Sequence, residues 1–134
     1  MENPSFKPKI EVSNIDPEVK SYIYQSLAEF EPFITPNTLI TVVAKDPLRL
    51  ISQFEAEGVG YDRAELKVLN RISIYLTEDG NKLEEEGLHA DIFQAISLAK
   101  GKLLKTLNEI QDNVISSQER VVQINMARQN GSIH

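Results

Sequence analysis

Three stretches of the chain are predicted to be β-strands, and in the first and third of them apolar and polar residues alternate, which is the pattern of a strand with one buried face. The first stretch is residues 9–13, and the second, residues 38–45, is rich in the β-branched residues that strands favour. The third, residues 65–77, places Leu, Val and Ile at alternate positions, with one breach at Asn70. The other face of this third strand is predicted to carry Lys67, Leu69, Arg71, Ser73 and Tyr75.

A tight turn after the third stretch predicts a hairpin. Asp79 and Gly80 can adopt the positive φ angles that a two-residue hairpin loop demands. Residues 82–88 are therefore expected to return antiparallel as a fourth strand. The glutamates at 84–86 direct at least one carboxylate to the helix-covered face, which favours a short strand or one at the edge of the sheet.

Two other stretches have apolar residues at helical spacing. The first begins at Asp16 and Pro17, which are residue types that favour a helix start, and its stripe runs to about residue 34. The second begins at Asp91 and keeps a 3.6-residue period. Its stripe is predicted to contain Ile92, Ile96, Ala99, Leu103, Leu107, Ile110 and Val114.

The remaining segments are less regular. Residues 46–60 form an insert that is predicted to be a short helix or an ordered loop. Residues 115–134 form an extension that could prolong the last helix, pack on a neighbour or be mobile. The element order β-α-β-β-β-α predicts one α+β domain over residues 1–134, with its core at about residues 8–114. It is a two-layer sandwich, in which two helices cover one face of a four-stranded sheet.

Composition narrows the class of protein. The chain has 14 Lys and Arg against 20 Asp and Glu, so its net charge is −6, which disfavours a general nucleic-acid binder but allows a local basic face. Because it has no cysteine, a disulfide scaffold and a thiolate metal site are excluded. The sequence shows neither an apolar run long enough to span a membrane nor a signal-peptide pattern. We expect a cytoplasmic protein that binds neither membrane nor DNA.

The sequence gives little indication of catalysis. The sequence lacks a nucleophile elbow, a phosphate-cradling glycine loop and a zinc-protease helix. A metal or general-base site built from His89, Glu86 and Asp91 is conceivable, but a solvated histidine near a helix start is the more common meaning of such residues. The prediction is therefore a protein that is not an enzyme and has no metal site and no cofactor.

The open face of the predicted sheet offers different chemistry. Lys9, Lys67, Arg71 and Tyr75 are expected on it, and Lys102 and Lys105 lie on the outer side of the last helix. Cations interleaved with an aromatic ring are the residue types that contact RNA, because phosphates pair with the cations and a base stacks on the ring. A solvated or protein-binding sheet remains the alternative.

The fourth strand and the last helix resemble those of the ribosome hibernation-promoting factors, also called the ribosome-associated inhibitor or sigma-modulation family. The helix start matches the family pattern at Asp91, Ile92, Phe93, Ala95 and Ile96. Further on, the run from Lys102 to Leu107 resembles the family's Lys-Leu-x-Arg-x-Leu pattern, with Lys105 in place of Arg. The predicted element order is also that of this family, so the resemblance covers about residues 8–114.

The resemblance implies a non-catalytic stress-response factor that docks in the small ribosomal subunit and keeps ribosomes idle. The predicted rRNA-binding residues are the cations Lys67, Arg71, Lys82, Lys102 and Lys105, as phosphate contacts, and Tyr75 as a stacking surface. The alternative is a protein-interaction module of the same fold that has lost rRNA binding. It would form a homo-oligomer or bind a protein partner through a sheet edge or the apolar positions of the extension.

Overall fold

The computed structural model describes the backbone of residues 8–129 and the side chains of residues 8–114. The chain divides into two compact units, residues 1–103 and residues 104–134. The first unit holds the sheet and the helices that cover it. The second unit holds the rest of the last helix.

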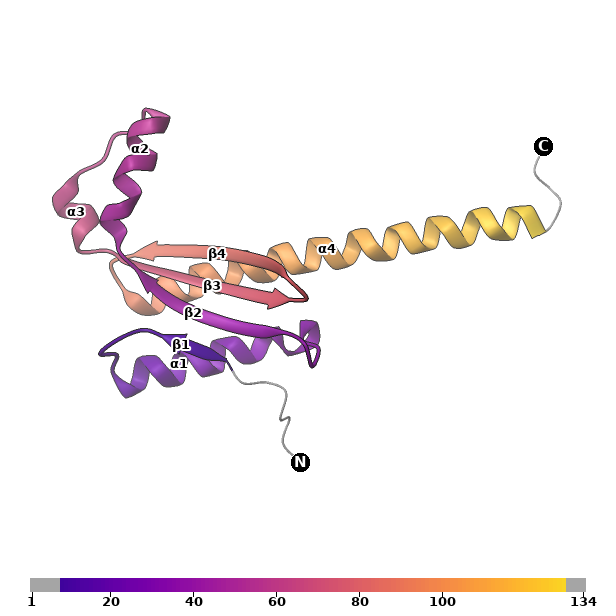
Figure 1. The fold of residues 1–134 in the computed structure, drawn as a ribbon, viewed down its shortest axis with the longest axis horizontal. Helices are drawn as coiled ribbons and strands as arrows, with labels where there is room; N and C mark the ends of the chain where they lie inside the picture. Colours follow the sequence, from indigo (N-terminus) through magenta and orange to yellow (C-terminus); the bar gives the residue numbers. More distant parts are fainter. Residues whose placement is uncertain (1–7, 130–134) are drawn as a thin grey trace. The chain divides into compact units, whose positions relative to one another are not determined.

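The first unit is built on one four-stranded sheet with the strand order β1-β2-β3-β4 (Figure 1). The strands are β1 (Lys9–Glu11), β2 (Leu39–Lys45), β3 (Asn70–Glu78) and β4 (Asn81–His89). β1 is parallel to β2, as the helical connection between them allows, and the other neighbours are antiparallel. The predicted α+β fold class is confirmed.

The predicted hairpin joins β3 to β4. Asp79 and Gly80 have φ angles of 52° and 83°, the left-handed values that a two-residue loop of this kind needs. The loop sets the register, in which Leu76 lies opposite Leu83 and Ile74 lies opposite Glu85. β4 forms one edge of the sheet, in agreement with the expectation from its glutamates.

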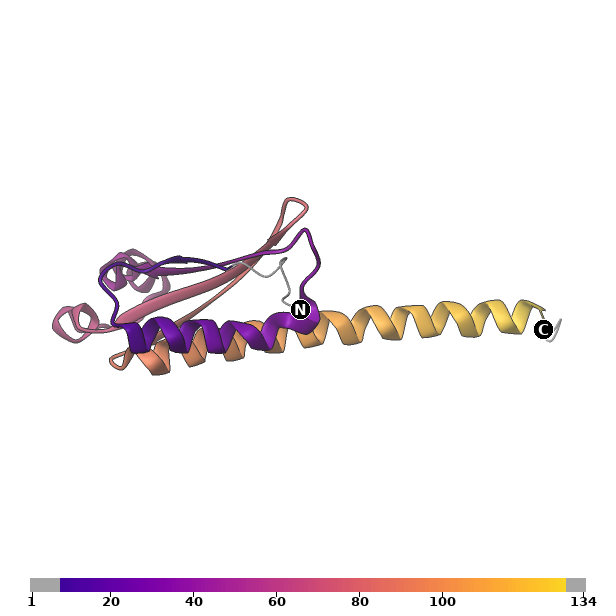
Figure 2. The same ribbon diagram turned by 90° about the horizontal axis from the view of Figure 1, so that it is seen from below.

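One face of the sheet is covered by α1 (Pro17–Leu27), which continues as the 3-10 helix η1 (Ala28–Phe33), and by the start of α4 (Ile92–Gln129) (Figure 2). The rings of Tyr22 and Phe93 pack edge to face, with their centroids 5.3 Å apart. The Tyr22 hydroxyl also hydrogen-bonds to Ser97, so these two contacts join α1 to α4. The core between helices and sheet contains Val19, Ile23, Leu27, Phe30, Ile40, Val42, Ile72, Ile74, Leu76, Ala95, Ile96, Ala99 and Leu103.

The two predicted helix starts differ. Asp91 Oδ1 accepts a hydrogen bond of 3.0 Å from the Phe93 backbone nitrogen, so this residue begins α4 as its pattern predicts. Asp16 precedes α1, but its side chain makes no capping hydrogen bond, and Pro17 at the first position favours the start there.

The predicted start of the third strand was wrong. Residues 65–69 are not in β3, because a short helix, α3 (Arg63–Lys67), occupies part of them. Asp62 Oδ1 accepts hydrogen bonds from the nitrogens of Ala64 (2.9 Å) and Glu65 (3.3 Å), which stabilises a helical turn there. Val68 is consequently 68% exposed rather than buried, and Lys67 lies outside the sheet.

The insert is helical and is not an ordered loop. It contains the 3-10 helix η2 (Pro47–Leu50) and α2 (Ile51–Glu57). Asp46 caps η2 by accepting from the Leu48 nitrogen at 2.9 Å. No residue of η2 or α2 is buried, so the insert adds little to the core.

The second unit consists, as far as the structure describes it, of the continuation of α4 from Leu104 to Gln129. The extension therefore prolongs the last helix over residues 115–129, and residues 130–134 lie outside the described part. The predicted apolar stripe is half-buried at Ile92 and buried from Ile96 to Leu103, whereas Ile110 and Val114 are 43% and 49% exposed. None of the described helices combines the length and apolar character needed to cross a membrane.

Candidate nucleic-acid interface

The open face of the sheet is built by alternation along β3. Ile72 and Ile74 point into the core, so Arg71, Ser73 and Tyr75 belong to the opposite face. Residues directly opposite in an antiparallel pair share a face, and Ser73 lies opposite Glu86 and Tyr75 opposite Glu84. Two carboxylates of β4 therefore lie among the predicted RNA-binding residues.

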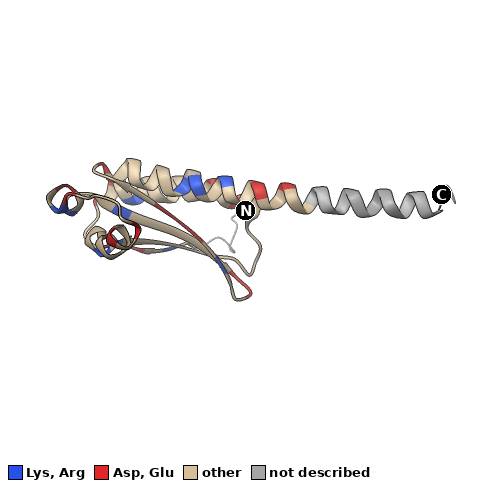
Figure 3. Ribbon diagram, turned by 90° about the horizontal axis from the view of Figure 1, so that it is seen from above, with Lys and Arg blue, Asp and Glu red and all other residues tan. Residues whose placement is uncertain are grey.

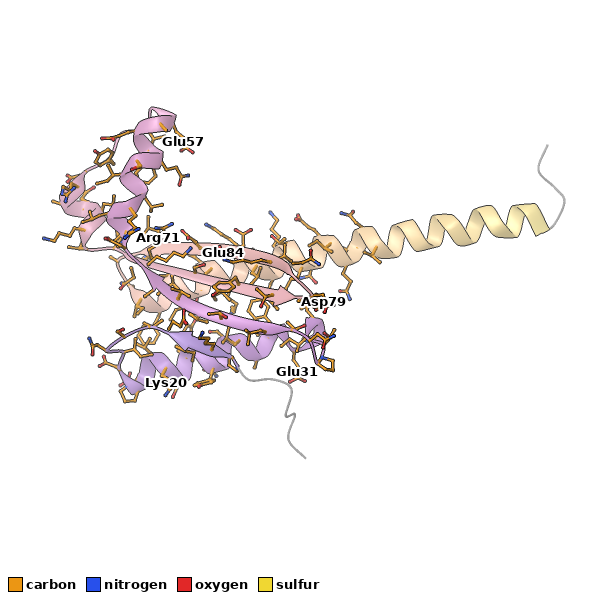
Figure 4. The ribbon with its side chains drawn as sticks, in the orientation of Figure 1. Lys20, Glu31, Glu57, Arg71, Asp79 and Glu84 are labelled. Carbon is orange, nitrogen blue, oxygen red and sulfur yellow. The ribbon has the colours of Figure 1, made fainter. Side chains whose placement is uncertain are left out.

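These carboxylates bind the neighbouring cations in a network formed by Lys45, Arg71, Ser73, Glu84 and Glu86, which we call the open-face network. Figure 4 labels two of its members, Arg71 and Glu84. Lys45 Nζ lies 2.6 Å from Glu84 Oε2 and 3.1 Å from Glu86 Oε2. Arg71 donates to both Glu86 oxygens, from Nε at 2.8 Å and from Nη2 at 3.1 Å. The Ser73 hydroxyl donates to Glu84.

The network changes the pKa values of its members. Burial raises the pKa of Glu84, but hydrogen bonds from Lys45 and Ser73 outweigh it and lower that pKa to about 2. Burial acts in the same direction on Glu86, and hydrogen bonds from Arg71 and Lys45 again produce a lowered pKa. Burial lowers the pKa of Lys45, but its two glutamate partners outweigh it, so the pKa is raised. Both carboxylates and the ammonium are therefore charged at neutral pH.

Arg71 is fixed from a second side. Its Nη1 donates to the Asp46 carbonyl oxygen at 3.2 Å, so all three guanidinium nitrogens have protein partners. Its side chain is only 15% exposed. Arg71 thus joins β3, β4 and the start of the insert.

Tyr75 and Lys82 form the other part of the open face. Lys82 Nζ lies 4.2 Å from the centroid of the Tyr75 ring, which is the geometry of a cation–π contact. The same nitrogen is 3.4 Å from Glu84 Oε1, and the Lys82 side chain is 51% exposed. Lys82 is much more accessible than Arg71, whereas Tyr75 is half-buried.

The other predicted site residues lie elsewhere. Lys102 is on α4, and its Nζ donates to the Glu86 carbonyl oxygen at 2.9 Å, at the outer edge of β4. Lys67 is on α3, and the prediction that it shares the sheet face with Arg71 was wrong. Lys105 is exposed and belongs to the second unit. The structure thus gathers Arg71, Tyr75 and Lys82 on the sheet face.

Lys45 was not among the predicted site residues, although it connects both glutamates. It lies directly opposite Arg71 in the β2–β3 register. Its position at the end of a strand does not distinguish it in the sequence. It is identified only by the β2–β3 register taken together with the β3–β4 register, which bring Lys45, Arg71 and Glu86 side by side.

Charge on the described residues is mixed rather than segregated. Figure 3 shows basic and acidic segments interspersed over the strands and the insert. Lys9 pairs with Glu11 at 3.0 Å and Lys100 with Glu29 at 2.6 Å, in addition to the open-face network. Most cations of the sheet face are therefore balanced by a nearby carboxylate.

The alternative site at His89 has a structural explanation. His89 Nδ1 accepts a hydrogen bond of 2.9 Å from the Asp91 nitrogen, while the Asp91 side chain caps α4. Glu86 is held by Arg71 on the open face. Glu86 is therefore engaged apart from His89 and Asp91, and the described residues contain no group of three or more that could hold a metal ion.

A cleft of about 500 Å³ opens beside the network, at the carboxyl ends of β1 and β2. Lys45 and Arg71 line one part of it, and Asp16 and Asp91 line another. The mixed charge of these walls selects no single class of small ligand.

Comparisons with known proteins give a similarity at the level of fold. No protein-family model and no curated protein matches the sequence. Among solved structures, a ribosomal subunit interface protein from Coxiella burnetii is similar, with a TM-score of 0.51 and 12% sequence identity. The match covers 78% of this chain and 97% of that chain. At this identity it shows that the two proteins share a fold, which is the fold expected from the sequence resemblance.

Proposed function

We propose that this chain is a non-catalytic cytoplasmic factor that binds the small ribosomal subunit and promotes translational idling. The observation that carries the proposal is the similarity to a ribosomal subunit interface protein, which extends over 97% of that protein. The resemblance of β4 and the first turns of α4 to the hibernation-promoting family supports it independently.

The cations differ in how easily each could exchange its protein partner for a phosphate. Lys82 is exposed and its ion pair with Glu84 is long, so a phosphate can replace this partner at small cost. Lys102 lies nearby at the edge of β4, bound to a neutral carbonyl oxygen among its contacts. Arg71 is different, because drawing it away would leave Glu86 with less compensation in a partly buried place. We assign it the role of holding the face together.

Tyr75 is the proposed stacking surface. Its ring is covered on one side by Lys82, and a base that stacks there would place its phosphate near the displaced ammonium. The ring and the cation would then act as one contact. Lys67 and Lys105 would add phosphate contacts outside the sheet face.

Cosedimentation with purified small ribosomal subunits tests the proposal. The chain should pellet with the subunits at low salt, and its affinity should fall by decades between about 50 and 200 mM salt if six or more phosphates are engaged. The double variant Lys82→Gln/Lys102→Gln should pellet less. The matched control is Lys20→Gln, on the exposed side of α1, which should pellet as the unmodified chain does. Absence from the pellet at every salt concentration refutes the proposal.

The open-face network favours a second candidate, a protein-interaction module that has lost rRNA binding. Three of the cations on this face already have carboxylate partners, which reduces the field that would attract RNA. Such a module would bind a protein partner along the β4 edge, where polar backbone groups of the strand are available. It predicts no pelleting of the chain with subunits at any salt concentration.

A further inference from the structure

The helix of the second unit has an apolar stripe that lacks cover among the described residues. Ile110 and Val114 are about half exposed, although both continue the stripe that is buried as far as Leu103. A helix in water gains most of its stability from packing an apolar face rather than from intrinsic propensity. We therefore expect the helix from Leu104 to Gln129 to be stabilised by a partner that packs on this stripe.

The spacing of the stripe changes at Leu103. From this residue on, the steps are four, three, four, three, four and three, which is the 3.5-residue period of a coiled coil. Leu107, Val114 and Val121 occupy position a of the heptad, and Ile110, Ser117 and Ile124 occupy position d. The next a position is Arg128, where the apolar pattern ends. Leu103 starts this register but is buried in the first unit, so the available stripe runs from Leu107 to Ile124, with Ser117 as its one polar core position.

The residues that flank the stripe indicate which partner fits. In a coiled coil, the e and g positions face the neighbouring helix and select it by charge. Here the positions next to the described part of the stripe are uncharged, with Gln111 at e and Asn113 at g. The sequence continues with Gln118 and Asn125 at e and Arg120 at g. Two identical helices can thus meet without repulsion between like charges, and the flanks offer little to attract a charged foreign helix.

The charged residues in the part of this segment whose side chains are described occupy other positions of the heptad. Lys105 and Asp112 are at f and Glu109 is at c, and all three side chains are exposed. The stripe and the charges therefore divide the helix into two faces. The face with Lys105 stays accessible when the stripe is covered.

We propose that residues 107–124 form a coiled coil with the same helix of a second copy of this chain. The proposal does not rest on ribosome binding, because it uses the apolar stripe and not the cations. β-branched Val at position a is compatible with a two-stranded coil, and Ile at position d also allows three strands.

The test is the mass of the full chain in solution, measured by sedimentation equilibrium over a wide range of concentrations. The expected mass is two or three times 15.1 kDa and falls towards 15.1 kDa on dilution. Ile110→Asp and Val114→Asp should each give the single-chain mass at concentrations where the unmodified chain is associated. Asn108→Asp adds the same charge at the exposed b position and should leave the association unchanged.

Two results would overturn the proposal. One is a mass of 15.1 kDa for the unmodified chain at every concentration. The other is an associated chain whose mass does not respond to Ile110→Asp, which would place the interface elsewhere. Circular dichroism checks that the first unit of each variant stays folded. Cosedimentation of the Ile110→Asp variant with ribosomal subunits is measured in a separate experiment. The coiled-coil proposal and the ribosome proposal can therefore fail independently of each other.

Discussion

Gly87 of β4 lies directly against the backbone of Ala95 in α4. A Cβ atom at Gly87 would overlap the Ala95 carbonyl oxygen and would stand 2.8 Å from the Ala99 nitrogen. The absence of a side chain at this position thus allows the helix to approach the edge strand and fill the space over Ile72, which faces Gly87 across the ladder.

Gly87→Ala should therefore destabilise the first unit. Because backbone atoms cannot move aside as a flexible side chain can, the loss should reach or exceed the upper part of the usual range for overpacking, about 1–3 kcal/mol. Gly101→Ala is the matched control, since nothing lies within 4 Å of a Cβ there. That change should stabilise the α4 helix by up to about 1 kcal/mol. Urea unfolding of both variants measures the difference, and equal effects would contradict the close approach.

Acid should weaken the open-face network. The pKa of Glu84 is about 2 in the folded chain against an ordinary value of 4.5, so the folded state holds the proton less tightly than the unfolded state. Its contribution to stability is then fully present above about pH 4.5 and is lost as the pH falls towards 2. Urea unfolding as a function of pH should show this loss. Ser73→Ala should make the loss smaller, because it removes one donor to the carboxylate.

Removal of Arg71 should cost more stability than removal of an exposed lysine. Arg71→Ala deletes two hydrogen bonds to Glu86 and one to the Asp46 carbonyl, and hydrogen bonds of charged groups contribute about 1.5–3 kcal/mol each before non-additivity. We expect a net loss of about 2–4 kcal/mol. Lys9→Ala breaks only an exposed pair with Glu11 and should not change the unfolding midpoint measurably. An equally small effect at Arg71 would contradict its role in holding the face.

Tyr75 should contribute to ribosome binding through its ring and not its hydroxyl. Tyr75→Ala should lower the affinity for small subunits on the order of tenfold, since stacking of one base contributes about 1–3 kcal/mol. Tyr75→Phe retains the ring and should bind as the unmodified chain does. A loss of equal size in both variants would show that stacking is not the contact made there.

Much of the fold could be predicted because its signals are local. The β-branched run of β2, the alternation over β3, the Asp79-Gly80 turn and the Asp91 cap each depend on neighbouring residues, and all four are confirmed. The start of β3 failed because alternation continued through residues 65–69, while the Asp62 cap favoured a helical turn. Capping by one side chain here outweighs a period of two.

The candidate site was less predictable because it depends on contacts between distant residues. Sequence alternation placed Arg71 and Tyr75 on one face, but the pairing of Arg71 with Glu86 follows from the hairpin register and side-chain reach. Lys45 enters the same network through the β2–β3 register. The sequence therefore gives the number of charged residues on this face, but it does not show which cation pairs with which carboxylate.

The most direct test of the ribosome proposal is the salt dependence of the affinity for purified small ribosomal subunits. The logarithm of the association constant should fall linearly with the logarithm of the salt concentration. The slope should become shallower by about one for each of Lys82→Gln and Lys102→Gln. Binding that is absent at low salt, or that is equally steep in both variants and the unmodified chain, would contradict it.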